Sequence, residues 1–427
     1  MEETGLKQEN ERLKTAIAEL SVLNDIATTI TSTQPVDQIV ASIVNKCVKH
    51  MKVEQGVVML LDEQDRNNPL HTMIRKQDSG EKLLSYQLDS QLTGWMIKNK
   101  KPLLINNLQD DQRFKYTVEN DSPIYSLLSV PLNIKNKMIG LLAVFNKKAN
   151  ELFNENDKRL LAIIASQSAQ IIENSRLIKQ ESQLRLMNED MRLAKETQLN
   201  LLPKNLPLIN NYQIGAKSIP AKQVGGDYYD VMQVDDSKFA FCLGDVSGKG
   251  LPAAMLVSNL QATLRSQTFT CDSCKQIIAN SNNLLYRSSE PSKFATLFYG
   301  ILNSGSHEIV FCNAGHNNPL LFSYEKELLE LKTGGIMIGS FPDLLFEESK
   351  IIIEKGSTIV IYSDGISEAM NENEEEYGED NLKITVLNNL NKSPNSIIEN
   401  ILSDVEKFVG GAPQSDDMTL VVIKRTD

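Results

Sequence analysis

Apolar positions in the first part of the chain alternate between helical and strand-like spacing. In segment 36–51, Ile39, Ile43, Val44 and Cys47 recur on one helix face, which predicts an amphipathic helix with Cys47 in a core. Three apolar runs are expected to be buried strands: 56–62, 126–134 and 140–148. The short link between the last two runs predicts a hairpin. Residues 31–175 are therefore predicted to form an α/β domain.

A period of seven runs through residues 1–30. One heptad position holds Leu6, Leu13, Leu20 and then Ala27, and the position four residues after each leucine holds Asn10, Ile17 and Asn24. Asparagine at core positions of a heptad favours a two-stranded coiled coil in one register. The segment is predicted to form a parallel dimer, with a helix packed on its own domain as the alternative.

The helix that closes the first domain is predicted to continue from about 155 to 201, with Asn154 and Asp157 as its N-terminal cap. Three series repeat every seven residues: Ile164, Ile171 and Ile178; Leu177, Leu184 and Met191; Met187, Ala194 and Leu201. The first two series are one residue out of phase near 177–178. No Gly or Pro interrupts the helix before Pro203, so residues 176–203 are predicted to be a stiff coiled-coil linker.

Beyond residue 204 the pattern becomes mostly β, with aspartates at the ends of predicted strands. They are Asp227 in VGGDYYD, Asp245 in GDVSGKG, Asp364 in YSDGIS, and the pair Asp416 and Asp417 in QSDDMT. Any one of them alone is typical of a turn, and Gly225 and Gly226 are expected to be turn residues.

Gathered at one edge, these carboxylates would repel one another unless a cation offset their charge. A ligand set made only of oxygen favours Mg²⁺ or Mn²⁺ over Zn²⁺ or copper. Two such ions about 4 Å apart can activate one water for attack on phosphorus. The pattern therefore predicts a hydrolytic site without a protein nucleophile.

Composition limits the possible partners. The length of 427 residues predicts two or three domains, and a formal net charge of −11 argues against nucleic-acid or anionic-membrane binding. Five scattered cysteines are typical of a reducing compartment, and no apolar run reaches the ~18 residues of a membrane span. A cytoplasmic protein is expected.

Two family resemblances follow from these segments. The order helix, strands, hairpin and helix over 36–175, with the intervening stretch 92–114, resembles a GAF domain, which implies an unidentified small ligand or a dimerisation role. VGGDYYD, GDVSGKGLPAAM, FATLFYGIL, NAGHNNPLL, YSDGISEAMN and SDDMTLVVI occur in the order found in metal-dependent (PPM) protein phosphatases of the bacterial SpoIIE/RsbU-like branch, which controls sporulation and general stress. QLNLLPKNLP, upstream of them, resembles the entry to that domain.

The second resemblance implies an αββα sandwich over 204–427, and thus an α+β multidomain protein. It implies a phosphoserine or phosphothreonine phosphatase with two Mn²⁺ or Mg²⁺ ions, acting on a STAS-type anti-anti-sigma factor. The GAF domain is expected to regulate it through a homodimeric linker helix whose rotation shifts the first helices of the phosphatase domain.

The residue roles that the resemblance implies are assigned motif by motif. Asp245 would bridge both metals, and Val246 would offer its carbonyl. Asp227 would hold the second ion, largely through water, while Asp364 and Asp416 would hold the first. Asp417 remains an alternative to Asp416.

Several alternatives remain beside this assignment. GDVSGKG lacks the spacing of a nucleotide-binding phosphate loop. In the helix after it, Met255, Leu256, Leu260 and Leu264 are expected to pack inward. His316 is either a structural residue or a general acid. Lys222 is the nearest candidate to an arginine that binds the substrate phosphate in larger relatives.

The rival functions are a non-catalytic PPM-like module that acts by partner switching and a Ca²⁺-stabilised scaffold.

Overall fold

The computed structural model describes residues 34–61, 70–77, 90–114, 124–135, 137–290 and 292–427, together with positions 9–10, 13–14, 16–17, 20–21 and 24–25. It divides into two compact units, Met1–Leu186 and Met187–Asp427, of which each is described by itself. No helix within these described ranges is long and apolar enough to cross a membrane.

The first unit contains a five-stranded antiparallel sheet in the order β2-β1-β5-β4-β3. Its strands are β1 (Val53–Leu61), β2 (Leu70–Gln77), β3 (Leu103–Ile105), β4 (Leu127–Ile134) and β5 (Lys137–Lys147), and a 3-10 turn, η1 (Lys148–Asn150), follows β5. Strands β4 and β5 pair from Ile134 opposite Lys137, so the predicted hairpin is confirmed.

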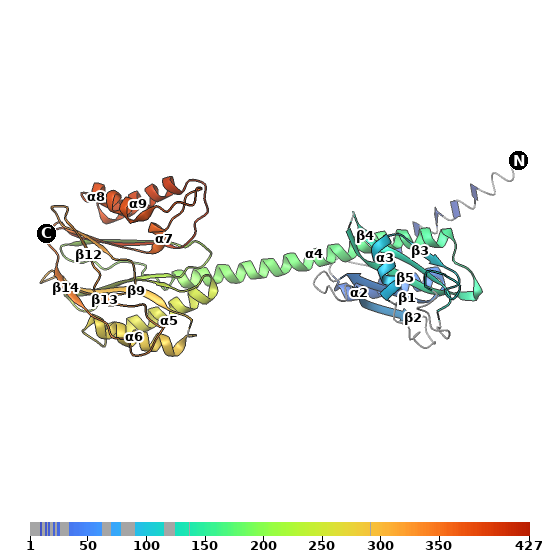
Figure 1. Ribbon diagram of the computed structural model, residues 1–427, viewed down its shortest axis with the longest axis horizontal. Coiled ribbons are helices and arrows are strands. Elements are labelled where there is room, and N and C mark those ends of the chain that lie inside the picture. The colour runs from blue at the N-terminus through green and yellow to red at the C-terminus, as the bar shows by residue number, and fades with distance from the viewer. Residues whose placement is uncertain are drawn as a thin grey trace. The chain divides into compact units, whose positions relative to one another are not determined.

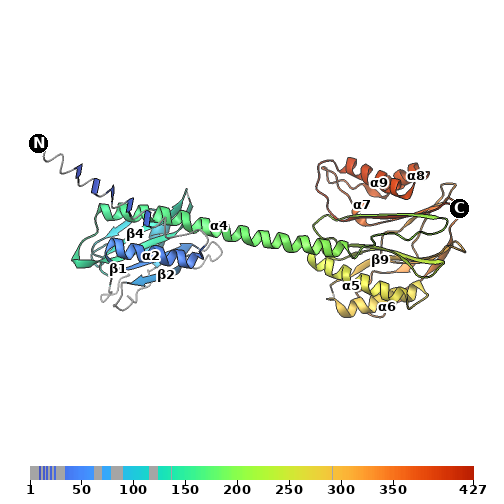
Figure 2. The same ribbon diagram turned by 180° about the vertical axis from the view of Figure 1, so that it is seen from behind.

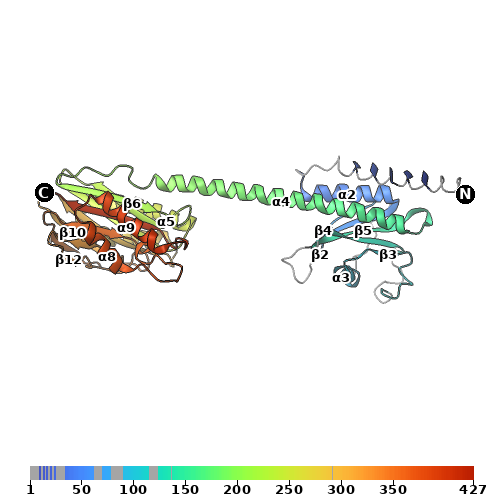
Figure 3. The same cartoon turned by 90° about the horizontal axis from the view of Figure 1, so that it is seen from above.

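Helices cover both faces of this sheet. Helices α2 (Val36–Met51) and α4 (Glu155–Leu199) lie on one face and α3 (Ser90–Asn99) lies on the other (Figure 3). The face of α2 predicted from its spacing is buried, Cys47 included, and Leu161, Ile164 and Ala165 of α4 join the same core. Alternate side chains of β1, such as Val57 and Met59, turn to the opposite core beneath α3.

Helix α4 is continuous over 45 residues, as predicted. The Asn154 side chain accepts hydrogen bonds from the backbone N–H groups of Asn156 and Asp157, and Asp157 accepts one in return from that of Asn154, so the predicted cap is confirmed. Burial in the first core ends at Ser175, and Leu177, Leu184 and Met187 are more than half exposed. In the N-terminal heptads, Leu6 and Ala27 lie outside the described residues.

Two sheets form the middle of the second unit. One has the order β13-β10-β9-β8-β7 with β14 also on β10, and the other the order β12-β11-β15-β16-β6. The strands of the first are β7 (Asp227–Gln233), β8 (Lys238–Val246), β9 (Ala295–Asn303), β10 (Glu308–Ala314), β13 (Gly334–Gly335) and β14 (Ser349–Ile352). Those of the second are β6 (Tyr212–Ile219), β11 (Leu320–Phe322), β12 (Leu328–Glu330), β15 (Thr358–Tyr362) and β16 (Met418–Arg425).

Helices α5 (Leu251–Thr268) and α6 (Cys274–Ser288) cover the first sheet, and α8 (Gly378–Asn389) and α9 (Pro394–Val409) cover the second (Figures 1 and 2). The short helix α7 (Asp364–Ser367) follows β15 directly. Phe241 and Phe298 from one sheet meet Ile361 and Val421 from the other in a core between them. The predicted αββα sandwich is therefore confirmed.

Candidate metal centre

Asp227 and Asp245 stand opposite each other in the ladder between β7 and β8. Strand β8 is buried along most of its length because Ala240 and Cys242 face the helices while Phe239 and Phe241 face the second sheet. The strand therefore carries Asp245 to the edge of the sandwich on a rigid support. Asp227 begins β7 and is buried, whereas Asp245 is partly exposed.

The second sheet brings its aspartates to the same edge. Strands β15 and β16 are antiparallel neighbours, with Tyr362 opposite Leu420, so the end of β15 lies beside the start of β16. Asp364 follows the first strand and Asp416 precedes the second, and both are partly exposed. The Ser363 hydroxyl donates to the Asp417 carbonyl at 3.0 Å and ties the two strand ends together.

Asp417 joins the two sheets through its side chain. Its carboxylate accepts hydrogen bonds from the backbone N–H of Ala221 at 2.7 Å, from that of Gly226, and from that of Asp227 at 3.3 Å. Both of its oxygens are therefore engaged by the segment that leads into β7. The Asp417 carboxylate is thus buried and engaged by the backbone, whereas Asp416 is the more exposed member of the pair.

The charges of these carboxylates act on one another. Burial, and after it the charges of Asp364 and Asp416, raise the pKa of Asp245 to about 7. Burial and the Asp245 charge raise the pKa of Asp227 well above its usual range. Burial and the Asp416 charge also raise the pKa of Asp364. The aspartates predicted from the sequence thus form one cluster of interacting negative charge.

One cation of the protein already contacts this cluster. The Lys249 ammonium lies 2.8 Å from an Asp416 carboxylate oxygen and donates to the Ser415 carbonyl at 2.9 Å. Gly248 and Gly250, on either side of the lysine, have positive φ angles of 102° and 78°, a backbone conformation that glycine adopts without strain. The loop after β8 can therefore turn sharply enough to bring Lys249 to Asp416.

The donor set fits a hard divalent cation. Asp227 Oδ2 is buried and has no hydrogen-bond partner, which is costly unless a cation or an ordered water meets it. Over the part of the chain that the structure describes, no three His, Cys, Asp or Glu side chains are already close enough to form a metal cage. Within the described residues the cluster is therefore not a closed cage, and one of its carboxylates, Asp416, is paired with Lys249.

Gly225 and Gly226 lie in the bent segment that leads into β7, where turn residues are expected, and glycine is also needed there for space. Neither has a positive φ angle. A Cβ atom on Gly225 would lie 2.4 Å from Asp417 Oδ2, and one on Gly226 would lie 3.0 Å from both Asp245 Oδ1 and the Val246 carbonyl. Glycine at both positions lets the backbone approach the carboxylates closely.

Of the other candidates, His316 lies close to the cluster, because its partner Thr296 stands opposite Asp245 in the ladder between β8 and β9. His316 is buried, its Nδ1 is 2.9 Å from the Thr296 hydroxyl, and burial lowers its pKa to about 4, so it is uncharged at neutral pH. Asp230 is buried against the Arg265 guanidinium at 2.7 Å and anchors α5 to β7. Lys222 is exposed. Met255 is 68% exposed, so the expectation that it packs inward is wrong.

Gln198 was not predicted to be a functional residue. Its side-chain amide donates to the Gly225 carbonyl at 2.7 Å and accepts from the Gly225 N–H at 2.9 Å. A sequence signal existed, because Gln198 falls seven residues after Met191, where the repeat of apolar residues would continue.

The αββα sandwich is the fold of PP2C-type phosphatase domains, and it brings strand ends with aspartates from both sheets to one edge. Residues 235–426 match the family of Stage II sporulation protein E (SpoIIE), and residues 33–173 match the GAF domain family. Residues 33–173 thus form a GAF-type domain and residues 235–426 belong to a SpoIIE-type phosphatase domain, as both resemblances predicted. Asp227 lies just before the matched phosphatase segment.

Known proteins with this kind of domain are similar over much of the chain. Phosphoserine phosphatase RsbU of Bacillus subtilis (strain 168) is 27% identical over 322 residues, which are 75% of this chain and 92% of RsbU. Protein IcfG of Synechocystis sp. is 28% identical over 58% of this chain, but the match spans only 43% of IcfG. The structure of the SiaA-PP2C domain of Pseudomonas aeruginosa is similar at 19% identity and a TM-score of 0.50. The match covers 57% of this chain and 98% of that domain, and it supports the fold.

Proposed function

We propose that the chain is a Mn²⁺- or Mg²⁺-dependent protein phosphatase that hydrolyses phosphoserine or phosphothreonine. The observation that carries this proposal is the meeting of Asp227 and Asp245 from one sheet with Asp364 and Asp416 from the other, because such a cluster is stabilised by cations. Burial, and after it the charges of Asp364 and Asp416, raise the pKa of Asp245 to about 7, and a bound cation would offset both effects.

In this proposal two metal ions share the cluster. Asp245 would contribute to both ions and Val246 would offer its carbonyl, Asp227 would serve the second ion, and Asp364 and Asp416 would serve the first. The unpartnered Asp227 Oδ2 supports its assignment. When bound, the ions would lower the pKa of the attacking water and offset the charge of the phosphate. Asp417 holds the backbone that presents Asp227, and Lys249 must release Asp416.

The proposed substrate is a phosphoserine or phosphothreonine of a STAS-type anti-anti-sigma factor. The similarity to RsbU, a protein named as a phosphoserine phosphatase, supports phosphoserine, since that match covers most of both chains. His316 is uncharged at neutral pH and buried, so the proposal gives it a structural role rather than that of a general acid.

The proposed assembly is a homodimer through the linker helix. Leu177, Leu184 and Met187 of α4 are 52%, 60% and 63% exposed, and burying this apolar series against a second copy would remove it from water. We propose domain limits of 1–30 and 176–203 for the coiled-coil segments, 31–175 for the GAF domain and 204–427 for the phosphatase.

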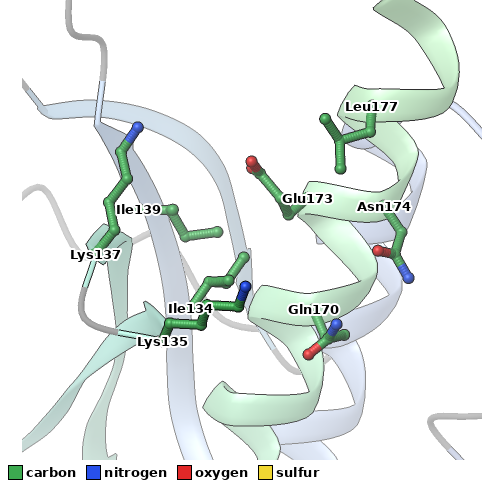
Figure 4. A pocket seen from close by; sticks show the side chains of 8 residues that line it. All are labelled: Ile134, Lys135, Lys137, Ile139, Gln170, Glu173, Asn174 and Leu177. Carbon is green, nitrogen blue, oxygen red and sulfur yellow. The ribbon is translucent and has the colours of Figure 1, made fainter. Parts of the chain in front are cut away.

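The GAF domain is proposed to regulate the phosphatase through α4. A pocket lies between the β4–β5 hairpin and α4, where burial of the helix in the first core ends (Figure 4). Its walls are Ile134, Lys135, Lys137 and Ile139 from the hairpin and Gln170, Glu173, Asn174 and Leu177 from the helix. A ligand or partner bound there would contact the helix beside the 177–178 phase change, which makes the pocket a candidate for signal input.

The alternative is a non-catalytic PPM-like module that acts by partner switching. It predicts loss of the ligand aspartates, and all of them are present.

The decisive experiment is phosphate release from a phosphoserine-containing STAS protein with Mn²⁺, with Mg²⁺ and with EDTA. Release that requires either metal supports the enzyme, whereas binding of the partner without any release supports the alternative.

A further inference from the structure

We propose that Gln198 is a positioning residue through which helix α4 holds the segment Gly225–Asp227 in the arrangement that the metal site needs. The inference rests on the proposed metal site and goes beyond it, because it names the contact by which the linker helix reaches that site. All the residues involved lie in the second unit.

The contact between Gln198 and Gly225 is two-sided. The Gln198 amide donates to the Gly225 carbonyl at 2.7 Å and accepts from the Gly225 N–H at 2.9 Å, so it fixes both polar groups of one backbone residue. A single hydrogen bond would allow the segment to swing, but a paired set holds its orientation as well as its distance.

Gly225 is also confined on its side-chain face. A Cβ atom there would lie 2.4 Å from Asp417 Oδ2, so the glycine backbone lies against that carboxylate. The next two N–H groups, of Gly226 and Asp227, donate to the same Asp417 side chain. The segment is therefore held by α4 through Gln198 and by the start of β16 through Asp417, and a shift of either support moves Asp227.

The position of Gln198 in α4 explains why a polar residue is found there. It continues the series Leu177, Leu184 and Met191, and its neighbours on that face, Met191 and Ala194, are partly buried. Three residues further on, Leu201 packs into the core beneath α5, and the Gln261 side chain donates to its carbonyl at 3.0 Å. The apolar face of the linker helix thus ends in one polar contact with the site and one apolar contact with the core.

The test measures Mn²⁺ binding by calorimetry on the full-length chain, with Gln198→Met as the variant. Methionine keeps the length and the helix propensity of the side chain but can form neither hydrogen bond. Gln183→Met is the matched control, since Gln183 is exposed on the same helix. We expect about 10-fold weaker Mn²⁺ binding for Gln198→Met, the usual effect of losing a partner that orients a ligand, and none for the control.

Thermal unfolding in EDTA distinguishes positioning from general loss of stability. Gln198→Met is expected to unfold near the wild-type temperature in EDTA but to gain less from added Mn²⁺. If it unfolds much earlier in EDTA, Gln198→Asn, which keeps the amide on a shorter arm, is measured in the same way. If a Gln198 variant folds and binds Mn²⁺ as tightly as the wild type, the inference about Gln198 is wrong, but the proposed function stands. If the wild type shows neither Mn²⁺ binding nor turnover, both the inference and the proposed function are wrong.

Discussion

Asp227 and Asp245 face each other across the β7–β8 ladder, and a Cβ atom on Gly226, the residue before Asp227, would lie 3.0 Å from Asp245 Oδ1. Two carboxylates so placed repel each other, and the burial of Asp227 strengthens the repulsion because little water screens it. The protein tolerates this arrangement without a salt bridge to either residue in the described part of the chain. That unsatisfied charge is the physical basis of the proposed metal site.

Gly226→Ala is predicted to damage the site directly. The added Cβ would lie 3.0 Å from Asp245 Oδ1 and from the Val246 carbonyl, so both must shift by a few tenths of an ångström. We expect Mn²⁺ affinity to fall by about 10-fold or more, because orientation of the ligands is lost. Gly94→Ala is the control, since a Cβ there meets nothing within 4 Å. Equal effects of the two substitutions on Mn²⁺ binding would contradict the account.

The metal-free protein is predicted to lose stability as pH rises toward neutrality. The pKa of Asp245 is raised from 3.8 to about 7, so the folded state binds its proton more strongly than the unfolded state does. Protonated Asp245 therefore stabilises the folded state in full below about pH 4. This stabilisation is lost as the pH rises through about 7 and the carboxyl group ionises.

The measurement is thermal unfolding in EDTA at pH 5 and pH 8 for the wild type and Asp245→Asn. Because the neutral amide cannot ionise, the variant should gain stability relative to the wild type on going from pH 5 to pH 8. An unchanged difference between the two proteins at the two pH values would show that Asp245 does not carry a raised pKa.

Lys249 is predicted to compete with metal for Asp416. Its ammonium contacts the Asp416 carboxylate at 2.8 Å, and removing it leaves the cluster more negative. Lys249→Met should bind Mn²⁺ about 3-fold more tightly at low salt, a modest effect because both side chains are partly exposed. Lys238→Met removes a remote surface cation and serves as the control. Weaker Mn²⁺ binding by Lys249→Met would mean that the lysine holds Asp416 in place for the metal.

Leu184→Asp is predicted to separate the proposed dimer. Leu184 lies in the exposed apolar series of α4, and a charge at that position opposes burial against a second copy. The molar mass from light scattering should fall by half. Ser182→Asp adds the same charge on the same helix outside the apolar series and should leave the mass unchanged. A monomeric wild type, or dimers that survive Leu184→Asp, would exclude this interface.

Sequence patterns predicted the supports of the site well. Strands β8 and β15 lie in the interior of their sheets, so their apolar runs are nearly continuous and mark where Asp245 and Asp364 leave the sheet. Helix α4 was predicted almost to the residue because no Gly or Pro interrupts it. Apolar runs and the absence of Gly or Pro are local features of the sequence, and they were enough to predict these helices and strands.

The contacts that couple the elements could not be read in this way. Lys249 and Asp416 are 167 residues apart, and Asp417 contacts a segment about 190 residues before it. In the sequence, Gln198 looks like any polar residue that interrupts a series of apolar heptad positions. Only the structure shows that its partner is the Gly225 backbone. Met255 is a residue for which the sequence predicted a contact that the structure does not show. It is adjacent to buried Leu256, and helical spacing alone did not exclude it from the buried face.

The most direct test of the central claim is turnover of p-nitrophenyl phosphate by full-length wild type and Asp245→Asn, each with Mn²⁺ and with EDTA. Asp343→Asn is the matched control, since Asp343 lies in a surface loop bonded to Asn283. The account predicts Mn²⁺-dependent hydrolysis in the wild type and the control, and a loss of about 100-fold or more in Asp245→Asn, because removing a shared ligand disrupts both metal positions. Mn²⁺-dependent hydrolysis by Asp245→Asn at the wild-type rate would contradict it.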